Sequence, residues 1–432
     1  MTKYNKDLNA QDAGDSSAKK NISVVAQNPT PPQADSKRLT TDFIELVQID
    51  SLSHQERQMA DCLTKKLESL GFVNIYEDKT GEIIGGNAGN VVGLLKGTKK
   101  DAPGILLTAH MDTVVPGIGK KPIIDGDTIR TDGTTILGAD DLAGVCSILE
   151  VSRMLKENKT PHGDVYVAFT VAEESGLEGS KHLDIRKMDA KYAFVMDMDF
   201  DIINEAGSAN SIKGKFLGKA AHAGVNPETG VNSLLMFANT MSEMSKKGLL
   251  GRIDPDNTSN LIIKEGGLAT NIIPENTLFE GEVRSMDPER LERTTAEIKQ
   301  IMNEKAKELG GKVELHIQRE FTGFKVAENH PIVDVVMRAS EKNHYPVNLV
   351  NTVGGCDAHE INKKGLPALL MPVTMLNEHT TAETIKVPDL KRATEYLYAV
   401  VQEVALEKKK GPTKEQTQSK GPKNIGEKSL EM

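Results

Sequence analysis

The sequence predicts an α/β fold in which a large domain with a central mixed sheet is interrupted by a smaller α+β domain. Apolar runs of strand length alternate with amphipathic helical stretches, which is typical of a sheet covered by helices on both faces. Within residues 213–323 this order of elements changes. A chain of 432 residues is also too long for one ordinary core.

In the large domain, apolar runs predict buried strands at residues 105–109, 165–170, 193–196 and 368–371. Apolar residues recur at helical spacing within 142–155 and again within 390–406. An Asp-Gly pair predicts a hairpin over residues 123–129.

In the inserted domain, the predicted elements are strand 211–217, helix 231–247, strands 261–264 and 277–284, helix 288–309 and strand 312–319. This order predicts a four-stranded sheet with two helices. We expect the chain to return to the large domain by residues 331–342.

The chain therefore divides into five segments. Residues 1–36 and 407–432 predict a disordered N-terminal arm and a disordered basic tail, because these polar segments cannot bury enough apolar surface to offset the cost of ordering. The large domain comprises residues 37–212 and 325–406, and the inserted domain comprises residues 213–324.

Composition argues against several classes of protein. A net charge of -9 and a pI near 5.7 argue against a nucleic-acid partner. No run approaches the roughly 20 apolar residues of a membrane-spanning helix, and no apolar signal core is present, so we expect a cytoplasmic protein without a membrane partner. Cys62, Cys146 and Cys356 lie far apart without CxxC spacing, which argues against a disulfide framework or a thiolate zinc site.

Acidic residues and histidines gather where predicted buried strands end. Five such clusters occur, at His110-Met111-Asp112, Asp140-Asp141, Glu173-Glu174, Asp197-Met198-Asp199 and Glu378-His379. Side chains at the carboxyl ends of strands in an open sheet emerge where ligand sites form. Carboxylates and imidazoles are metal ligands, so the five clusters together predict a metal site.

Each cluster also has a structural interpretation. His110 and Asp112 could form a solvated pair, although strand alternation also lets Asp112 fix the tautomer of a metal-binding His110. An aspartate before a helix is a normal N-cap, and we keep this interpretation for Asp141. Two adjacent glutamates at a buried strand end repel each other unless a cation neutralises one, so Glu173 and Glu174 favour the metal site.

These motifs, in their order along the chain, resemble the co-catalytic di-zinc exopeptidase family that includes peptidase T, carboxypeptidase G and the acetylornithine and succinyl-diaminopimelate deacylases. The resemblance is strongest to peptidase T-like proteins. It implies two Zn²⁺ ions per subunit bridged by Asp140, one completed by His110 and Asp197 and the other by Glu174 and His379. Co²⁺ and Mn²⁺ are alternatives, because such ligands also bind them.

The same resemblance implies a reaction and its catalytic groups. Glu173 would be the general base that takes a proton from a metal-activated water and later gives it to the leaving amine. Asp112 would orient His110. The implied function is a zinc-dependent exopeptidase, an aminopeptidase acting on short peptides such as tripeptides.

The inserted domain would serve as a lid and would hold a homodimer together. By resemblance, His222 would reach the partner subunit's site and stabilise the oxyanion, while Asn271 and Arg284 would contact substrate backbone or carboxylate. Gly355, in a glycine-rich loop, would let the backbone approach the substrate. A structural histidine and a surface ion-pair arginine are the corresponding alternatives.

One departure from peptidase T leaves the substrate open. Peptidase T has an arginine before the two glycines of this loop and a threonine after them, where this chain has Val353 and Cys356. An N-acyl amino acid amidohydrolase using the same ions is therefore an alternative, as is a non-catalytic metal- or peptide-binding protein. The latter is disfavoured because every ligand position is filled. Cys356 and His359 lack a third group that would make the thiol a nucleophile.

Overall fold

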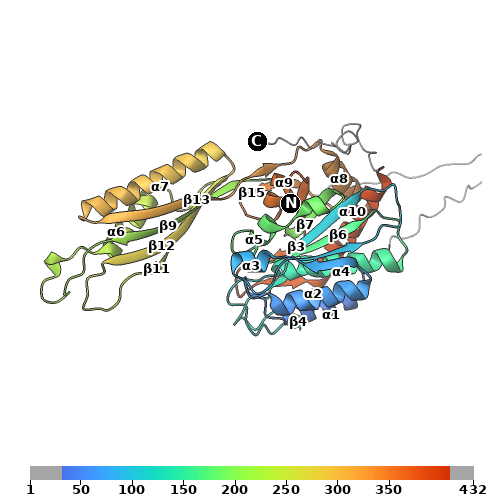
Figure 1. Ribbon diagram of the computed structural model, residues 1–432, viewed down its shortest axis with the longest axis horizontal. Coiled ribbons are helices and arrows are strands. Elements are labelled where there is room, and N and C mark those ends of the chain that lie inside the picture. Colours follow the sequence, from blue (N-terminus) through green and yellow to red (C-terminus); the bar gives the residue numbers. More distant parts are fainter. Residues whose placement is uncertain (1–31, 409–432) are drawn as a thin grey trace, which may run out of the picture. The chain divides into compact units, whose positions relative to one another are not determined.

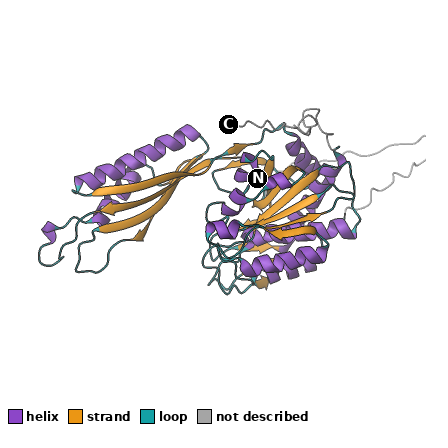
Figure 2. Cartoon of the chain, in the orientation of Figure 1, coloured by secondary structure: helices purple, strands orange, loops and turns teal. Residues whose placement is uncertain are grey.

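The computed structural model describes residues 32–408 (Figures 1 and 2). The predicted N-terminal arm and basic tail lie almost entirely outside the described residues. Among the described residues, no helix combines the length and the apolar character needed to cross a membrane.

A nine-stranded mixed sheet forms the centre of the larger part of the fold. Its middle strands run parallel: β6 (Val165–Thr170), β3 (Gly104–His110), β7 (Ala190–Met198) and β16 (Ala368–Pro372). The flanking strands are β1 (Val73–Glu77) and β2 (Val91–Leu95) on one side, and β8 (Ile202–Ala206), β14 (Phe324–Lys325) and β15 (Leu349–Thr352) on the other. The antiparallel pairing of β2 with β6 and of β16 with β8 makes the sheet mixed, as predicted.

Helices cover both faces of this sheet. The helices of one face are α1 (Ser36–Val47), α2 (Arg57–Leu70), α4 (Ala139–Glu157), α8 (Pro331–Asn343) and α10 (Val387–Leu406). The shorter helix α9 (Ala358–Lys363) packs on the other face, and α3 (Thr80–Ile84) contacts α5 (Glu178–His182). The α/β fold class is therefore confirmed.

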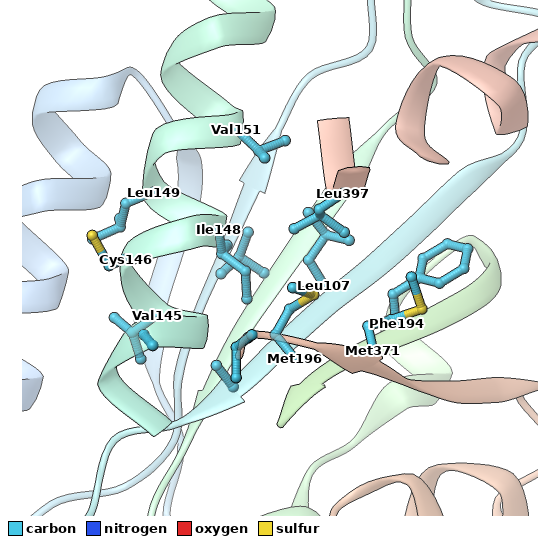
Figure 3. Close-up of a cluster of buried hydrophobic side chains, with 14 of the residues drawn as sticks. Leu107, Val145, Cys146, Ile148, Leu149, Val151, Phe194, Met196, Met371 and Leu397 are labelled. Atoms are coloured by element: carbon cyan, nitrogen blue, oxygen red, sulfur yellow. The ribbon is translucent and has the colours of Figure 1, made fainter. Parts of the chain in front are cut away.

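Alternation along the central strands explains why both faces need cover. In Figure 3, Leu107 and Met196 lie in the cluster that contains Ile148 of α4 and Leu397 of α10. Their neighbours in sequence, Leu106 and Val195, belong to a second cluster on the opposite face. All seven residues of β3 are buried, as expected of a parallel strand with helices on both sides.

Between β8 and β14 the chain forms a smaller antiparallel sheet with two helices. Its strand order is β10-β11-β12-β9-β13, with bounds β9 (Ser208–Leu217), β10 (Gly251–Asp254), β11 (Asn257–Glu265), β12 (Asn276–Ser285) and β13 (Lys312–Phe321). Helices α6 (Ser233–Lys246) and α7 (Pro288–Glu308) contact each other and β9 (Figure 1). Phe216, Phe279 and Ile298 belong to the separate core beneath them.

The prediction of four strands in this unit was wrong, because the structure has five. The additional strand β10 pairs with β11 across a short turn, with Asp254 opposite Asn257. It has only four residues, none of them fully buried, and two carry charge. A strand this short and polar gives no alternating signal, so only its pairing with β11 identifies it.

A third, four-stranded sheet has the order β17-β18-β5-β4. The predicted hairpin forms β4 (Ile123–Asp125) and β5 (Thr128–Arg130). Strands β17 (Met375–Leu376) and β18 (Thr384–Lys386) come from near the end of the described chain, and β18 pairs with β5. The loop between β17 and β18 carries His379.

Candidate active site

Strand order brings the predicted ligands to one edge of the central sheet. His110 ends β3, Glu173 and Glu174 follow β6, and Asp197 lies near the end of β7. Strands β6, β3 and β7 are parallel neighbours, so their carboxyl ends meet. Asp140 joins them from the start of α4.

Two groups of potential ligand atoms share Asp140. One contains His110, Asp140 and Asp197, the other Asp140, Glu174 and His379, and within each group the atoms lie within 4.8 Å of one another. Nε2 of His110 is 3.0 Å from Oδ1 of Asp140. Nε2 of His379 is 3.1 Å from the other oxygen, Oδ2, and 2.9 Å from Oε1 of Glu174. The two oxygens of Asp140 therefore face two different imidazoles.

Asp112 is fully buried behind this cluster and organises it. Nδ1 of His110 lies 2.9 Å from the Asp112 carbonyl oxygen and 3.3 Å from its Oδ1, which leaves Nε2 facing Asp140. The Asp112 carboxylate also accepts hydrogen bonds from the backbone N–H groups of Glu173 (3.0 Å) and Glu174 (3.3 Å). Ser53 donates a third, at 2.7 Å. One carboxylate thus orients the histidine and fixes the acidic pair.

The cluster holds more buried negative charge than its histidines balance. Burial raises the pKa values of Glu173 and Asp197 well above the ordinary range, and neighbouring carboxylates add to both shifts. Asp140, followed by Glu174, raises the pKa of His379 to about 10. Burial opposes ionisation of Asp140, but hydrogen bonds from His110 and His379 outweigh it and lower its pKa. This donor set fits divalent cations, which would neutralise the excess charge.

A cavity of about 760 Å³ opens beside the cluster. Its lining includes every predicted ligand except His110. Glu173, Arg284 and Gly355 also line it. Arg284 is half-buried, with Nη2 2.9 Å from Glu282 and its guanidinium 5.9 Å from the ring centre of Phe321. The structure therefore brings Arg284 and Gly355 to the same cavity as the ligands.

His222 and Asn271 lie elsewhere. Both are exposed, and neither lines the cavity. They do lie side by side, because the N–H of Ala223 donates to the carbonyl of Asn271 at 2.9 Å and His222 pairs with Ile272. Within one chain the structure does not bring them to the ligand cluster.

Asp141 caps helix α4, as predicted, and also binds the backbone of His110. Its Oδ1 accepts from the N–H of Gly144 in the first turn of α4, at 3.1 Å. Its Oδ2 accepts from the N–H of His110, also at 3.1 Å. The second contact joins β3 to α4, and the local sequence gave no sign of it.

Glu383 and Glu56 are two buried carboxylates that sequence reasoning missed. Glu383 accepts hydrogen bonds from the backbone of the segment that leads to Asp140. Glu56 accepts from the N–H groups of His54 (2.8 Å) and Ala172 (3.0 Å). The residues next to each of them in the sequence are mostly polar, so no local pattern distinguishes these two glutamates from exposed ones.

Cys356 is not placed as a nucleophile. Burial raises the pKa of its thiol well above the ordinary value, which disfavours the reactive thiolate. Its Sγ lies 3.5 Å from Nδ1 of His359. Both ring nitrogens of His359, however, lie 3.0 Å from backbone carbonyl oxygens, those of Cys356 and Gly207. The imidazole is held by the backbone rather than poised as a base.

An α/β sheet with an interrupting α+β unit and a carboxylate–imidazole cluster at its strand ends defines a hydrolase class. The chain belongs to Peptidase family M20/M25/M40, whose family model matches residues 106–403. It is therefore a peptidase.

Individual relatives place the chain among peptidase T-like members, as the resemblance implied. It is 40% identical to aminopeptidase PepT from Bacillus cereus, with a TM-score of 0.72 and coverage of 86% of this chain and 99% of that chain. It is 34% identical to a tripeptidase from Staphylococcus aureus, with a TM-score of 0.78 and coverage of 87% and 100%. It is also 38% identical to the uncharacterized protein YqjE of Bacillus subtilis, covering 85% of this chain and 99% of that protein.

Proposed function

We propose that this protein is a metal-dependent exopeptidase that removes the amino-terminal residue from short peptides, tripeptides among them. The observation that carries the proposal is the shared position of Asp140 in two ligand groups that border the same cavity as Glu173. Two relatives, an aminopeptidase and a tripeptidase, support the substrate class.

In this proposal two divalent ions bind at the cluster. His110 and Asp197 would hold one, Glu174 and His379 would hold the other, and Asp140 would belong to both sites. Carboxylate and imidazole ligands suit Zn²⁺, and they also bind Co²⁺ and Mn²⁺. Such a pair of ions, when bound, polarises a carbonyl and makes water a stronger acid.

Glu173 supplies the proton transfer. Its side chain lines the cavity and makes no hydrogen bond within the described residues, unlike that of Glu174, which contacts His379. Its backbone is fixed by Asp112. A carboxylate so placed takes a proton from the attacking water and delivers it to the leaving amine.

The cavity suits a short peptide in size and in charge. Its volume of about 760 Å³ lies within the range of small-ligand sites. Its lysine and arginine residues are Lys213 and Arg284, and Lys213 forms no ion pair within residues 32–408. With valine at position 353, we assign the binding of the substrate carboxylate to Arg284, whose planar guanidinium can bind both oxygens.

A homodimer completes the site in this proposal. The loops that carry His222 and Asn271 also carry apolar side chains in solvent, with Val225 75% and Leu268 92% exposed. A second copy of the chain that covers these loops would bring His222 and Asn271 toward its own cavity. A cytoplasmic location is part of the proposal and is supported by the three free cysteines.

Hydrolysis of free peptides tests the function. We expect the purified protein to release amino-terminal residues from a tripeptide panel, to lose this activity after chelation, and to regain it with Zn²⁺ or Co²⁺. Turnover that survives complete removal of the ions would contradict the proposal.

Val353, which stands where peptidase T has an arginine, supports a second candidate function, that of an N-acyl amino acid amidohydrolase. Because this chain lacks the arginine that peptidase T has at this position, it has one positively charged side chain fewer to bind the terminal carboxylate of a tripeptide. Parallel assays on free tripeptides and on N-acyl amino acids separate the two candidates. Faster hydrolysis of the N-acyl amino acids would replace the peptidase proposal with the second one.

A further inference from the structure

Glu383 is a buried carboxylate that joins the two segments on which Asp140 and His379 lie. Glu383 is only 1% exposed. Oε2 accepts the N–H groups of Leu137 and Gly138, both at 2.7 Å, and Oε1 accepts the N–H of Asp140 at 2.9 Å. Three donors therefore converge on one carboxylate, four residues after His379.

Neither segment has the regular backbone geometry of a helix or a strand where its ligand residue lies. Gly138 has a φ of 78°, and Asp140 has a ψ of 105° at the irregular start of α4. In the other segment Asn377 and His379 have positive φ, 57° and 60°, which non-glycine residues rarely adopt. Such backbone persists only where surrounding contacts fix it.

Few contacts other than those of Glu383 fix His379. Its side chain is 53% exposed, and within the described residues its imidazole has Asp140 and Glu174 as its only hydrogen-bond or ion-pair partners. An ion bound between these three would replace those contacts. The position of His379 before an ion binds therefore depends on its loop.

That loop is a small hydrogen-bonded unit anchored at Glu383. The N–H of Glu383 donates to the carbonyl of Thr380 at 3.1 Å, and the Thr380 hydroxyl donates to the carbonyl of Asn377 at 2.8 Å. Strand β18 begins at the next residue, Thr384, and pairs with β5. A displacement of the Glu383 carboxylate would therefore move the segment that carries His379.

We propose that Glu383 is a positioning residue that sets the separation of Asp140 and His379 and thereby the affinity for the ion they hold with Glu174. This inference rests on the proposed metal site. Groups that orient metal-binding side chains by hydrogen bonds typically change metal affinity by about 10–100-fold when they are mutated, and Glu383 holds the backbone of one such residue, Asp140. Glutamine has one acceptor oxygen where three N–H groups converge, so Glu383→Gln breaks this connection.

The test compares ion binding in full-length wild type, Glu383→Gln and Glu383→Asp. Affinities for Zn²⁺ and Co²⁺ are measured by competition with a chromophoric chelator, and the Co²⁺ absorption spectrum reports ligand geometry. We expect wild type to bind two ions and Glu383→Gln to bind one of them about 10–100-fold more weakly, with an altered spectrum. Glu383→Asp keeps the charge on a shorter side chain and should restore part of the affinity.

Glu150→Gln is the matched control. Glu150 is equally buried, but it lies on α4 and pairs with Arg38 and Arg153, each at 2.6 Å. We expect its substitution to lower the unfolding temperature of the ion-free protein and to leave both ion affinities unchanged.

The outcomes separate this inference from the proposed function. If Glu383→Gln binds both ions as tightly as wild type, Glu383 is only a structural residue and the inference is overturned. If Glu383→Gln does not fold, unchanged affinities in Glu383→Asp overturn it instead. If wild type itself binds no divalent ion, the proposed metal site fails rather than the role of Glu383.

Discussion

Glu173 and Glu174 are adjacent in sequence, yet their side chains have different surroundings. Oε1 of Glu174 lies 2.9 Å from the imidazole of His379, whereas Glu173 faces the cavity without a hydrogen-bond partner among the described residues. Asp112 holds the backbone of both. A single fixed turn therefore places one carboxylate against His379 and the other in the open cavity, as the proposed roles in ion binding and proton transfer require.

This difference predicts separable effects of two isosteric substitutions. Glu173→Gln should lower kcat by about 10²–10⁴-fold with both ions retained, because it removes only a proton acceptor. Glu174→Gln should lose one ion, because an amide is a poorer ligand than a carboxylate. Peptide turnover and metal content by mass spectrometry check both variants. A Glu173→Gln protein as active as wild type would exclude the assigned base.

Glu56 is a second residue whose burial has a measurable consequence. Burial, with the charge of Asp112 adding to it, raises the pKa of Glu56 to about 7. A carboxyl group with a raised folded-state pKa contributes stability below its unfolded value of 4.5, and this contribution is lost as the pH rises through about 7.

We therefore predict that Glu56→Gln gains stability relative to wild type as the pH rises. In the ion-free protein the two should match near pH 4, and by pH 8 the variant should be more stable by up to about 3 kcal/mol. Denaturant unfolding across this pH range measures the difference. A constant difference would show that Glu56 does not titrate in this window.

At the scale of elements, the loops of the five-stranded unit and the strand ends of the central sheet hold different parts of the proposed site. His222 and Asn271 are exposed on loops of the former, while the ligands lie at β3, β6, β7 and the β17–β18 loop. The separation within one chain is consistent with a site that a second subunit completes.

Subunit complementation tests this arrangement. His222→Ala and Glu173→Gln proteins should each be nearly inactive, but mixing them should restore about a quarter of wild-type activity. Half of the randomly mixed dimers contain both variants, and one of their two sites then combines an intact Glu173 with an intact His222. Co-purification of differently tagged His222→Ala and Glu173→Gln subunits provides the control for subunit exchange. No recovery despite demonstrated exchange would contradict a site shared between subunits.

For the whole molecule, protons and the proposed metal ions would compete for the same side chains. Asp140, followed by Glu174, raises the pKa of His379 to about 10, so its imidazole carries a proton at neutral pH in the ion-free protein. This protonation stabilises the ion-free fold below the unfolded pKa of 6.5, and the stabilisation is lost as the pH rises through about 10.

The apparent affinity for Zn²⁺ should therefore increase as the pH rises from 6 to 9, with proton release on binding. Calorimetric titration in buffers of different ionisation enthalpy measures the released protons. The His379→Ala protein should release fewer protons than wild type when it binds Zn²⁺. An affinity independent of pH would show that His379 binds no ion.

Prediction from sequence succeeded where local pattern carries the information. Strand ends such as those at His110 and Asp197 are visible because an apolar run stops and polar residues follow. The four-residue strand β10 was missed because its polar residues show no alternation, and its pairing with β11 defines it. The sequence alone could not distinguish Arg284, which lines the cavity, from His222, which does not.

The sequence by itself determined the α/β class and the set of acidic and histidine residues, because both follow from short apolar runs and the residues at their ends. Only the tertiary structure decided that β6, β3 and β7 are neighbours, which gathers these residues around Asp140. It also decided that Glu383 fixes a segment 243 residues away. The physical reason is that burial and hydrogen bonding between distant segments depend on packing, which no local pattern encodes.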